Sequence, residues 1–246
     1  MDAVAEGQSP PTLRFYQWVP TCLSLGKRQP LSGVSLDRCA RDGVDVVRRA
    51  TGGWAILHTD ELTYSIATTP DDPRAAGAIL DAYRRLSQGL VAGLRELGVS
   101  VAMSPVVPEG THNASAACFE VPSAYEITAG TLKLIGSAQT RPAGRVLQHG
   151  SLPLTGNIAR VTEYLWFQTE GDRAALAKHL RERATTLSDL LGRTVTFNEA
   201  AGALTRGFAS ALHLALEPGE PTPAELEAAQ RTAREKPITS VTDAVR

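Results

Sequence analysis

The chain has 246 residues, 43% of them hydrophobic, and its formal net charge at pH 7 is −1. This length and composition support one sizeable hydrophobic core within a single large α/β domain. A charge so near neutrality, with a pI of about 6.5, gives no reason to expect nucleic acid or a membrane surface as the main partner.

The pattern of cysteines favours a reducing compartment. Cys22, Cys39 and Cys118 have neither metal-ligand spacing nor the pairing of a disulfide framework. The sequence also lacks an apolar run near the ~18 residues that a membrane span needs, and it lacks a recognisable signal peptide. We therefore expect a cytoplasmic protein with no metal site.

The first third of the chain predicts short strands. Apolar and polar residues alternate over 13–19, and further strands are predicted before Gly26, at 44–47 and on both sides of a corner within 55–67. Residues 1–7 are typical of the end of a helix, so we expect the natural start of the protein to lie upstream.

The middle third predicts a long helix followed by a hairpin. Apolar residues at helical spacing predict an amphipathic helix within 72–97, used for core packing. A strand is predicted at 99–103, then a loop. A turn at 129–131 separates two strand-like runs, 119–128 and 132–139, which predicts a hairpin.

The last third is predicted to be helical. Two short helices are expected within 172–191. Capping patterns begin two more, one at Thr196 that runs to about residue 214 and one at Thr222 with Pro223 in its first position.

The predicted hairpin would carry Cys118 and Lys133 on adjacent strands. A free thiol has a pKa of about 8.5 and attacks as the thiolate, so a neighbouring ammonium would lower that pKa and hold the reactive form. Cys118 is therefore a candidate nucleophile and Lys133 a candidate base. For an arbitrary pair, the ordinary interpretation is a small buried hydrophobe and a solvated lysine.

Four segments together resemble the biotin/lipoate protein ligase superfamily in their order and spacing. They are RRATGGWAILHTDELTYSIA (48–67), CF followed by PSAYE (118–126), KLIGSAQ (133–139) and LQHGS (147–151). The resemblance is closest to octanoyl-[acyl carrier protein]:protein N-octanoyltransferases of the LipM type and extends over about residues 13–236. It implies an α+β fold, with a mixed, mostly antiparallel sheet flanked by helices and a helical C-terminal part.

The resemblance also implies one catalytic domain over 1–236, which lacks the first strand and helix usual in the family, a loose tail over 237–246 and a set of site residues. Cys118 and Lys133 are the implied catalytic pair. The implied substrate-binding residues are Arg49, Gly52, Gly53, His58, Gly136, Ser137, Ala138, His149 and Gly150. His58 also has the simpler interpretation of a structural hydrogen-bonding histidine, and His149 either positions the hairpin or lines the pocket. Trp54 departs from the smaller or basic residue common at its position, which puts the width of the pocket in question.

The implied reaction is a two-step acyl transfer in lipoate biosynthesis. Cys118 would take an octanoyl group from octanoyl-acyl carrier protein and pass it to the target lysine of a lipoyl domain or of glycine cleavage protein H. Lys133 would assist the proton transfers. No cofactor is implied, because a thioester is already activated. Arg141 and Arg145 are candidates for docking acidic carrier domains.

Three alternatives stay open at this stage. An ATP-dependent lipoate-protein ligase would share Lys133 and the arginine and glycine pairs but needs no cysteine. A lipoyl-domain amidotransferase has a similarly placed cysteine and takes its acyl group from another carrier protein. A catalytically silent binding module would be favoured if Cys118 or Lys133 were replaced, and neither is.

Overall fold

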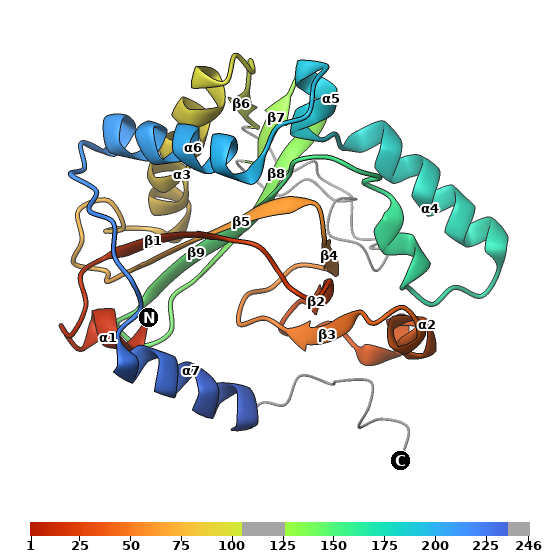
Figure 1. Ribbon diagram of the computed structural model, residues 1–246, viewed down its shortest axis with the longest axis horizontal. Helices are drawn as coiled ribbons and strands as arrows, with labels where there is room; N and C mark the ends of the chain where they lie inside the picture. The colour runs from red at the N-terminus through yellow and green to blue at the C-terminus, as the bar shows by residue number, and fades with distance from the viewer. Residues whose placement is uncertain (105–125, 236–246) are drawn as a thin grey trace.

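The larger of two β-sheets is antiparallel throughout. In the computed structural model, which describes residues 1–104 and 126–235, its six strands lie in the order β1-β5-β9-β8-β7-β6 (Figure 1). Every neighbouring pair is antiparallel. The strands are β1 (Thr12–Tyr16), β5 (Glu61–Thr68), β9 (Val146–Pro153), β8 (Leu132–Thr140), β7 (Ile127–Ala129) and β6 (Ala102–Met103).

A second, three-stranded sheet is mixed. Its central strand β2 (Cys22–Leu25) pairs in parallel with β3 (Asp45–Arg48) and antiparallel with β4 (Ile56–His58). The parallel pair is connected through a 3₁₀ turn, η1 (Leu31–Gly33), and α2 (Leu36–Arg41), as a crossover between parallel strands requires. The predicted mixed, mostly antiparallel architecture is therefore confirmed.

Two helices cover one face of the larger sheet. They are α3 (Ile79–Glu96) and α6 (Phe197–Leu212), which lie side by side above β5 and β8 in Figure 1. Their backbones are in close contact, since a Cβ atom added to Gly207 would lie 2.2 Å from the amide nitrogen of Gly93. Glycines therefore set the distance between these helices.

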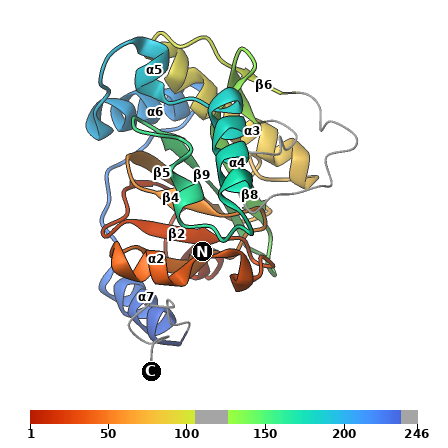
Figure 2. The same cartoon turned by 90° about the vertical axis from the view of Figure 1, so that its right-hand side faces the viewer.

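The other helices lie around the sheets. They are α1 (Asp2–Ala5), the 3₁₀ turn η2 (Arg160–Glu163), α4 (Glu170–Arg183), α5 (Leu187–Leu191) and α7 (Pro223–Glu235). Figure 2 shows α2 and the smaller sheet below β5 and β9, with α7 lower still. A hydrogen bond of 2.9 Å from the Ser9 hydroxyl to Glu225 ties the start of α7 to the N-terminal segment.

The predicted helix starts agree with the structure, with one correction. Thr196 and Thr222 each accept a hydrogen bond from a backbone amide three residues on, as their capping patterns predict. The helix predicted within 72–97, however, begins at Ile79. Asp72 instead accepts a bond from the Arg74 amide in a tight turn, and Gly77 has a left-handed φ of 82°, which ends that turn before the helix.

The predicted strands are shorter in the structure. The alternation predicted over 13–19 ends at Tyr16, and of 99–103 only Ala102–Met103 pairs. The hairpin turn is confirmed between β7 and β8, where Gly130 has a φ of 58°. The earlier part of the first hairpin strand, with Cys118, and the C-terminal tail lie outside the described residues.

Candidate active site

The candidate site lies on the face of the larger sheet that is turned toward the smaller one. Two rows of directly opposite residues cross this face. One row is Ala138, His149 and Ser65, and the other is Gly136, Ser151 and Thr63. Because opposite residues of antiparallel strands point to the same side, these rows share a face. The structure therefore places Gly136, Ala138 and His149 on one face of the sheet.

Ser137 and Gly150 lie on the opposite face. Ser137 accepts a 2.7 Å hydrogen bond from the Tyr64 hydroxyl on its side-chain oxygen. A Cβ atom at Gly150 would lie 2.6 Å from that same oxygen and 2.7 Å from the Tyr64 ring. Gly150 thus makes room for a core hydrogen bond beside α3. The Ser137 hydroxyl is used on the core side of the sheet, whereas its predicted role was substrate binding.

A buried polar network joins the two sheets. The Glu61 carboxylate, only 4% of whose residue surface is exposed, is hydrogen-bonded to His58 Nδ1, Thr63 Oγ1 and Ser151 Oγ. His58 Nε2 lies 2.7 Å from Ser24 Oγ on β2. The ring of His58 also stacks on Trp18, with 4.5 Å between ring centroids. Both ring nitrogens of His58 and its ring face are therefore in contact with other side chains, in agreement with its simpler interpretation as a hydrogen-bonding histidine.

Arg49 holds the loop that follows β3. Its guanidinium donates to the backbone carbonyls of Ser24 (2.8 Å), Gly52 (2.9 Å) and Trp54 (2.8 Å). A fourth contact, of 3.3 Å, joins Arg49 Nη1 to Ser24 Oγ. Since a planar guanidinium has several donors in a fixed arrangement, one side chain can fix three carbonyls at once.

Two glycines bring this loop against β2. A Cβ atom at Gly26 would lie 1.8 Å from the carbonyl oxygen of Gly53, so a side chain at position 26 is excluded by backbone. Gly53 itself has a φ of 90°. Gly53 therefore serves the left-handed turn, and Gly26 allows the close backbone approach.

His149 connects the loop to the larger sheet. Its Nε2 lies 2.6 Å from Thr51 Oγ1. Burial, with smaller contributions from the charges of Arg49 and His58, lowers the pKa of His149 from 6.5 to about 4. His149 is therefore neutral at neutral pH. It also lines the same sheet face as Ala138, so it both positions the loop and borders the space between the sheets.

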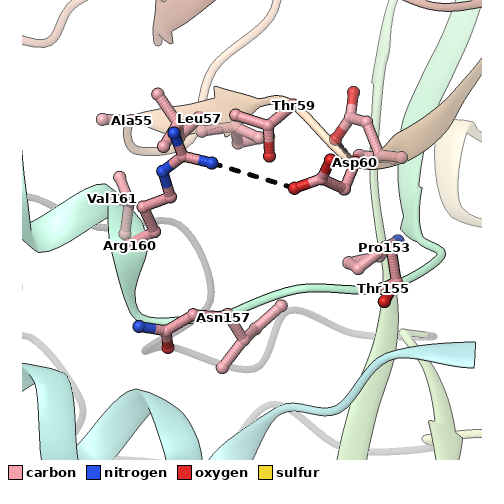
Figure 3. A pocket seen from close by; sticks show the side chains of 13 residues that line it. Ala55, Leu57, Thr59, Asp60, Pro153, Thr155, Asn157, Arg160 and Val161 are labelled. Atoms are coloured by element: carbon pink, nitrogen blue, oxygen red, sulfur yellow. Dashed lines mark hydrogen bonds and ion pairs between the residues drawn. The ribbon is translucent and has the colours of Figure 1, made fainter. Parts of the chain in front are cut away.

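A cleft opens beside this network, between the β4–β5 corner, the end of β9 and η2 (Figure 3). Asp60 and Arg160 face each other across it, 3.8 Å apart and both about half exposed. Glu61 and Ser151 contribute to its lining, so the buried carboxylate network borders an opening to solvent.

Lys133 lies at the start of β8 in a buried ion pair. Its Nζ is 2.5 Å from Oε1 of Glu126, and 6% and 2% of the two side chains are exposed. The Lys133 carbonyl accepts from the Thr185 amide at 3.0 Å, which ties this end of β8 to the segment after α4. The ordinary interpretation of Lys133 as a solvated strand residue is therefore wrong, because its side chain is buried.

Cys22 and Cys39 are both buried. Burial raises the pKa of Cys22 to about 12 and that of Cys39 to about 11. Neither thiol forms appreciable thiolate at neutral pH. Cys118, the predicted nucleophile, lies outside the described residues.

Arg141 and Arg145 have contacts of their own. Arg141 donates to the carbonyls of Gly77 (2.7 Å) and Ala75 (2.8 Å), so it anchors the loop before α3. Arg145 pairs with Asp2 at 2.7 Å. Docking of acidic carriers at these arginines stays a prediction.

Neither a metal centre nor a membrane-spanning helix is found among the described residues. Within 1–104 and 126–235, no group of three or more His, Cys, Asp or Glu side chains is placed to hold a metal ion. Nor does a helix in those ranges have the length and apolar character that a membrane crossing requires.

This chain is similar in sequence to proteins of one known family. Residues 1–209 match the family of the lipoyl protein ligase A/B catalytic domain, and the chain belongs to this family. The octanoyltransferase LipM of Kyrpidia tusciae is 41% identical over 236 residues, covering 94% of this chain and 86% of that protein. The octanoyltransferase LipM of Moorella thermoacetica is 42% identical over 222 residues, covering 89% and 81%.

Solved structures share the fold. A chain from the structure of the bi-partite lipoate protein ligase and E2 lipoyl domain of Thermoplasma acidophilum has a TM-score of 0.76 at 23% identity, covering 95% of this chain and 85% of that chain. This likeness confirms the predicted architecture.

Three polar residues of the site were not assigned a role from the sequence. Glu126 pairs with Lys133 across the hairpin turn, and Ser24 and Glu61 bind His58 from different strands. The hairpin spacing gave only an indirect signal for Glu126, because Lys133 lies opposite Thr128 and Glu126 precedes Thr128 by two residues. Ser24 meets His58 through the pairing of β2 with β4, and Glu61 follows His58 by three residues across the β4–β5 corner.

Proposed function

We propose that this chain is an octanoyltransferase that moves an octanoyl group from octanoyl-acyl carrier protein to the target lysine of a lipoyl domain or of glycine cleavage protein H. The observation that carries the proposal is the presence of Cys118 in the sequence together with a buried Lys133. An acyl-adenylate ligase has no use for that cysteine. The relatives named octanoyltransferase LipM, about 40% identical over most of the chain, support the same reaction.

In the first half of the proposed reaction, the Cys118 thiolate attacks the thioester carbonyl. A new sulfur–carbon bond forms, and the carrier thiol leaves and takes up a proton. In the second half the lysine amine attacks the acyl-enzyme, the sulfur–carbon bond to Cys118 breaks, and the amide forms as the proton lost by the amine passes to the departing Cys118 sulfur. The activated thioester supplies the driving force for both halves.

The environment of Lys133 supports a role in stabilising the Cys118 thiolate or a developing oxyanion. A buried ammonium is stabilised by the Glu126 carboxylate, and its position is fixed by hairpin and bridge contacts. In a site shielded from water, an ammonium strongly stabilises a neighbouring thiolate or a developing oxyanion. We propose that Glu126 keeps Lys133 in place for this purpose.

The acyl chain is proposed to lie between the sheets, against the face that carries Gly136, Ala138 and His149. The Arg49 loop, with Gly52 and Gly53, would form the opposite wall. The small residues Gly136 and Ala138 of β8 support this assignment, because they place little side-chain volume on this face, and the neutral His149 adds no charge to it.

The test is intact-mass spectrometry after incubation with octanoyl-acyl carrier protein in the absence of ATP. We expect an octanoyl adduct on the wild type and on the double variant C22A/C39A, and none on C118A. The adduct should disappear when a lipoyl domain is added. Transfer that occurs only with ATP and free octanoate would replace the transferase with a ligase.

A further inference from the structure

Glu61 is the centre of a directed set of hydrogen bonds. An ionised carboxylate can only accept, so each of its three partners must donate. Thr63 donates to Glu61 at 2.5 Å and itself accepts from the Trp18 indole at 3.0 Å. The same rule places a proton on His58 Nδ1, because that nitrogen faces the carboxylate.

The consequence extends through His58 to β2. With its Nδ1 protonated, a neutral His58 has Nε2 free to accept, and Ser24 Oγ lies 2.7 Å from it. If the Ser24 hydroxyl donates to His58, its oxygen remains an acceptor for Arg49 Nη1 at 3.3 Å. The direction of every bond from Arg49 to Glu61 is then determined.

This arrangement superficially resembles a serine–histidine–acid triad, but Ser24 is not placed to act as a nucleophile. Only 1% of Ser24 is exposed, and both its hydroxyl and its carbonyl are bound by Arg49. Arg49 in turn holds Gly52 and Trp54. The hydrogen-bond chain therefore ends in the loop that faces the larger sheet.

We propose that Glu61 is a positioning residue, which fixes the proton of His58 on Nδ1 and, through Ser24 and Arg49, holds the loop over 49–54 in the shape that accepts the acyl chain. The inference rests on the proposed function, because the loop is taken as one wall of the acyl pocket. It assigns Glu61 no proton transfer to substrate.

The test compares E61Q, which keeps the shape and removes the charge, with S24A, which cuts the chain beyond His58. For both we expect the KM for octanoyl-acyl carrier protein to rise by about tenfold, with kcat changed much less. Loss of one charge-assisted hydrogen bond weakens binding by about that factor. Discrimination between octanoyl and decanoyl donors should also weaken. Amide hydrogen exchange at Gly52 and Gly53 should quicken in both.

D72N is the matched control. Asp72 also has a largely buried carboxylate that accepts from a threonine and an arginine, but it lies in the turn before α3. It should lose stability without a change in KM. An unchanged KM and unchanged exchange in both E61Q and S24A would overturn the proposal.

The nitrogen-15 shifts of His58 separate this inference from the proposed function. In the wild type we expect protonation at Nδ1, and in S24A the same, whereas E61Q should show a mixture of tautomers. If the wild type takes no acyl group from any donor, the proposed function is lost and these shifts still decide the role of Glu61. A His58 tautomer that is the same in the wild type and E61Q contradicts it.

Discussion

Lys133 Nζ lies 2.5 Å from Glu126 Oε1, and this ion pair is almost completely removed from solvent. We expect E126A to destabilise the protein by about 3–5 kcal/mol, because it leaves a buried ammonium without its carboxylate. Urea unfolding measures this loss. The double variant K133M/E126L should recover most of the stability, since apolar residues of similar size replace the pair, yet it should form no acyl-enzyme. Acylation by that double variant would contradict the proposed role of Lys133.

The three cysteines should differ sharply in reactivity. The raised pKa values of Cys22 and Cys39, about 12 and 11, predict that neither reacts with iodoacetamide at pH 7.5 in the native protein. Native C118A should therefore remain unlabelled, and two thiols should become labelled after unfolding in guanidinium. Mass spectrometry counts the modified groups. Rapid labelling of native C118A would show that burial does not protect the other two.

His149 should make stability depend on pH below neutrality. Its folded pKa of about 4 lies below the unfolded value near 6.5, so the unfolded state binds the proton more readily. The folded state therefore loses relative stability as pH falls from about 6.5 to 4, and the loss is complete below that. We expect the wild type to lose about 2 kcal/mol more than H149Q between pH 7 and pH 5. Urea unfolding at both pH values checks the difference, and equal losses would contradict the burial of a neutral ring.

Gly26 and Gly52 form a matched pair for the loop. A Cβ atom at Gly26 would meet the Gly53 carbonyl oxygen at 1.8 Å, whereas one at Gly52 would meet nothing within 4 Å. We expect G26A to cost about 1–3 kcal/mol of stability by overpacking against backbone, and G52A to cost little. If Gly52 lines the acyl pocket, G52A should still weaken octanoyl transfer. Unfolding and acylation measurements on both variants separate the two effects.

Arg49 should not be replaceable by lysine. The guanidinium binds the carbonyls of Ser24, Gly52 and Trp54, and a single ammonium cannot span all three. We expect R49K to raise the KM for the octanoyl donor about tenfold or more, as loss of one to two charged hydrogen bonds implies. R160K, at the exposed pair with Asp60, is the control and should have little effect. Equal kinetics for R49K and the wild type would remove Arg49 from the site.

The sequence by itself determined the family, the order of the elements and the C-terminal helices. These follow from local chemistry: the capping threonines at 196 and 222 bond within one turn, and the glycine turn of the hairpin needs only its own residues. It also singled out Lys133, His58 and Arg49, because their motifs are contiguous in the chain. Helix length was less well determined, since Asp72 and Gly77 form a turn where the apolar spacing alone is compatible with a helix.

Only the tertiary structure decided which side chains share the site. Ser137 and Ala138 are neighbours in one motif, yet strand alternation places the Ser137 hydroxyl against Tyr64 and Ala138 on the face of His149. Ser24 reaches His58 only through the pairing of β2 with β4, and Glu61 reaches Ser151 only through the pairing of β5 with β9. Ser24 and His58, and likewise Glu61 and Ser151, are distant in sequence, and no spacing rule relates them. Their buried hydrogen bonds exist only once the sheets have closed around them.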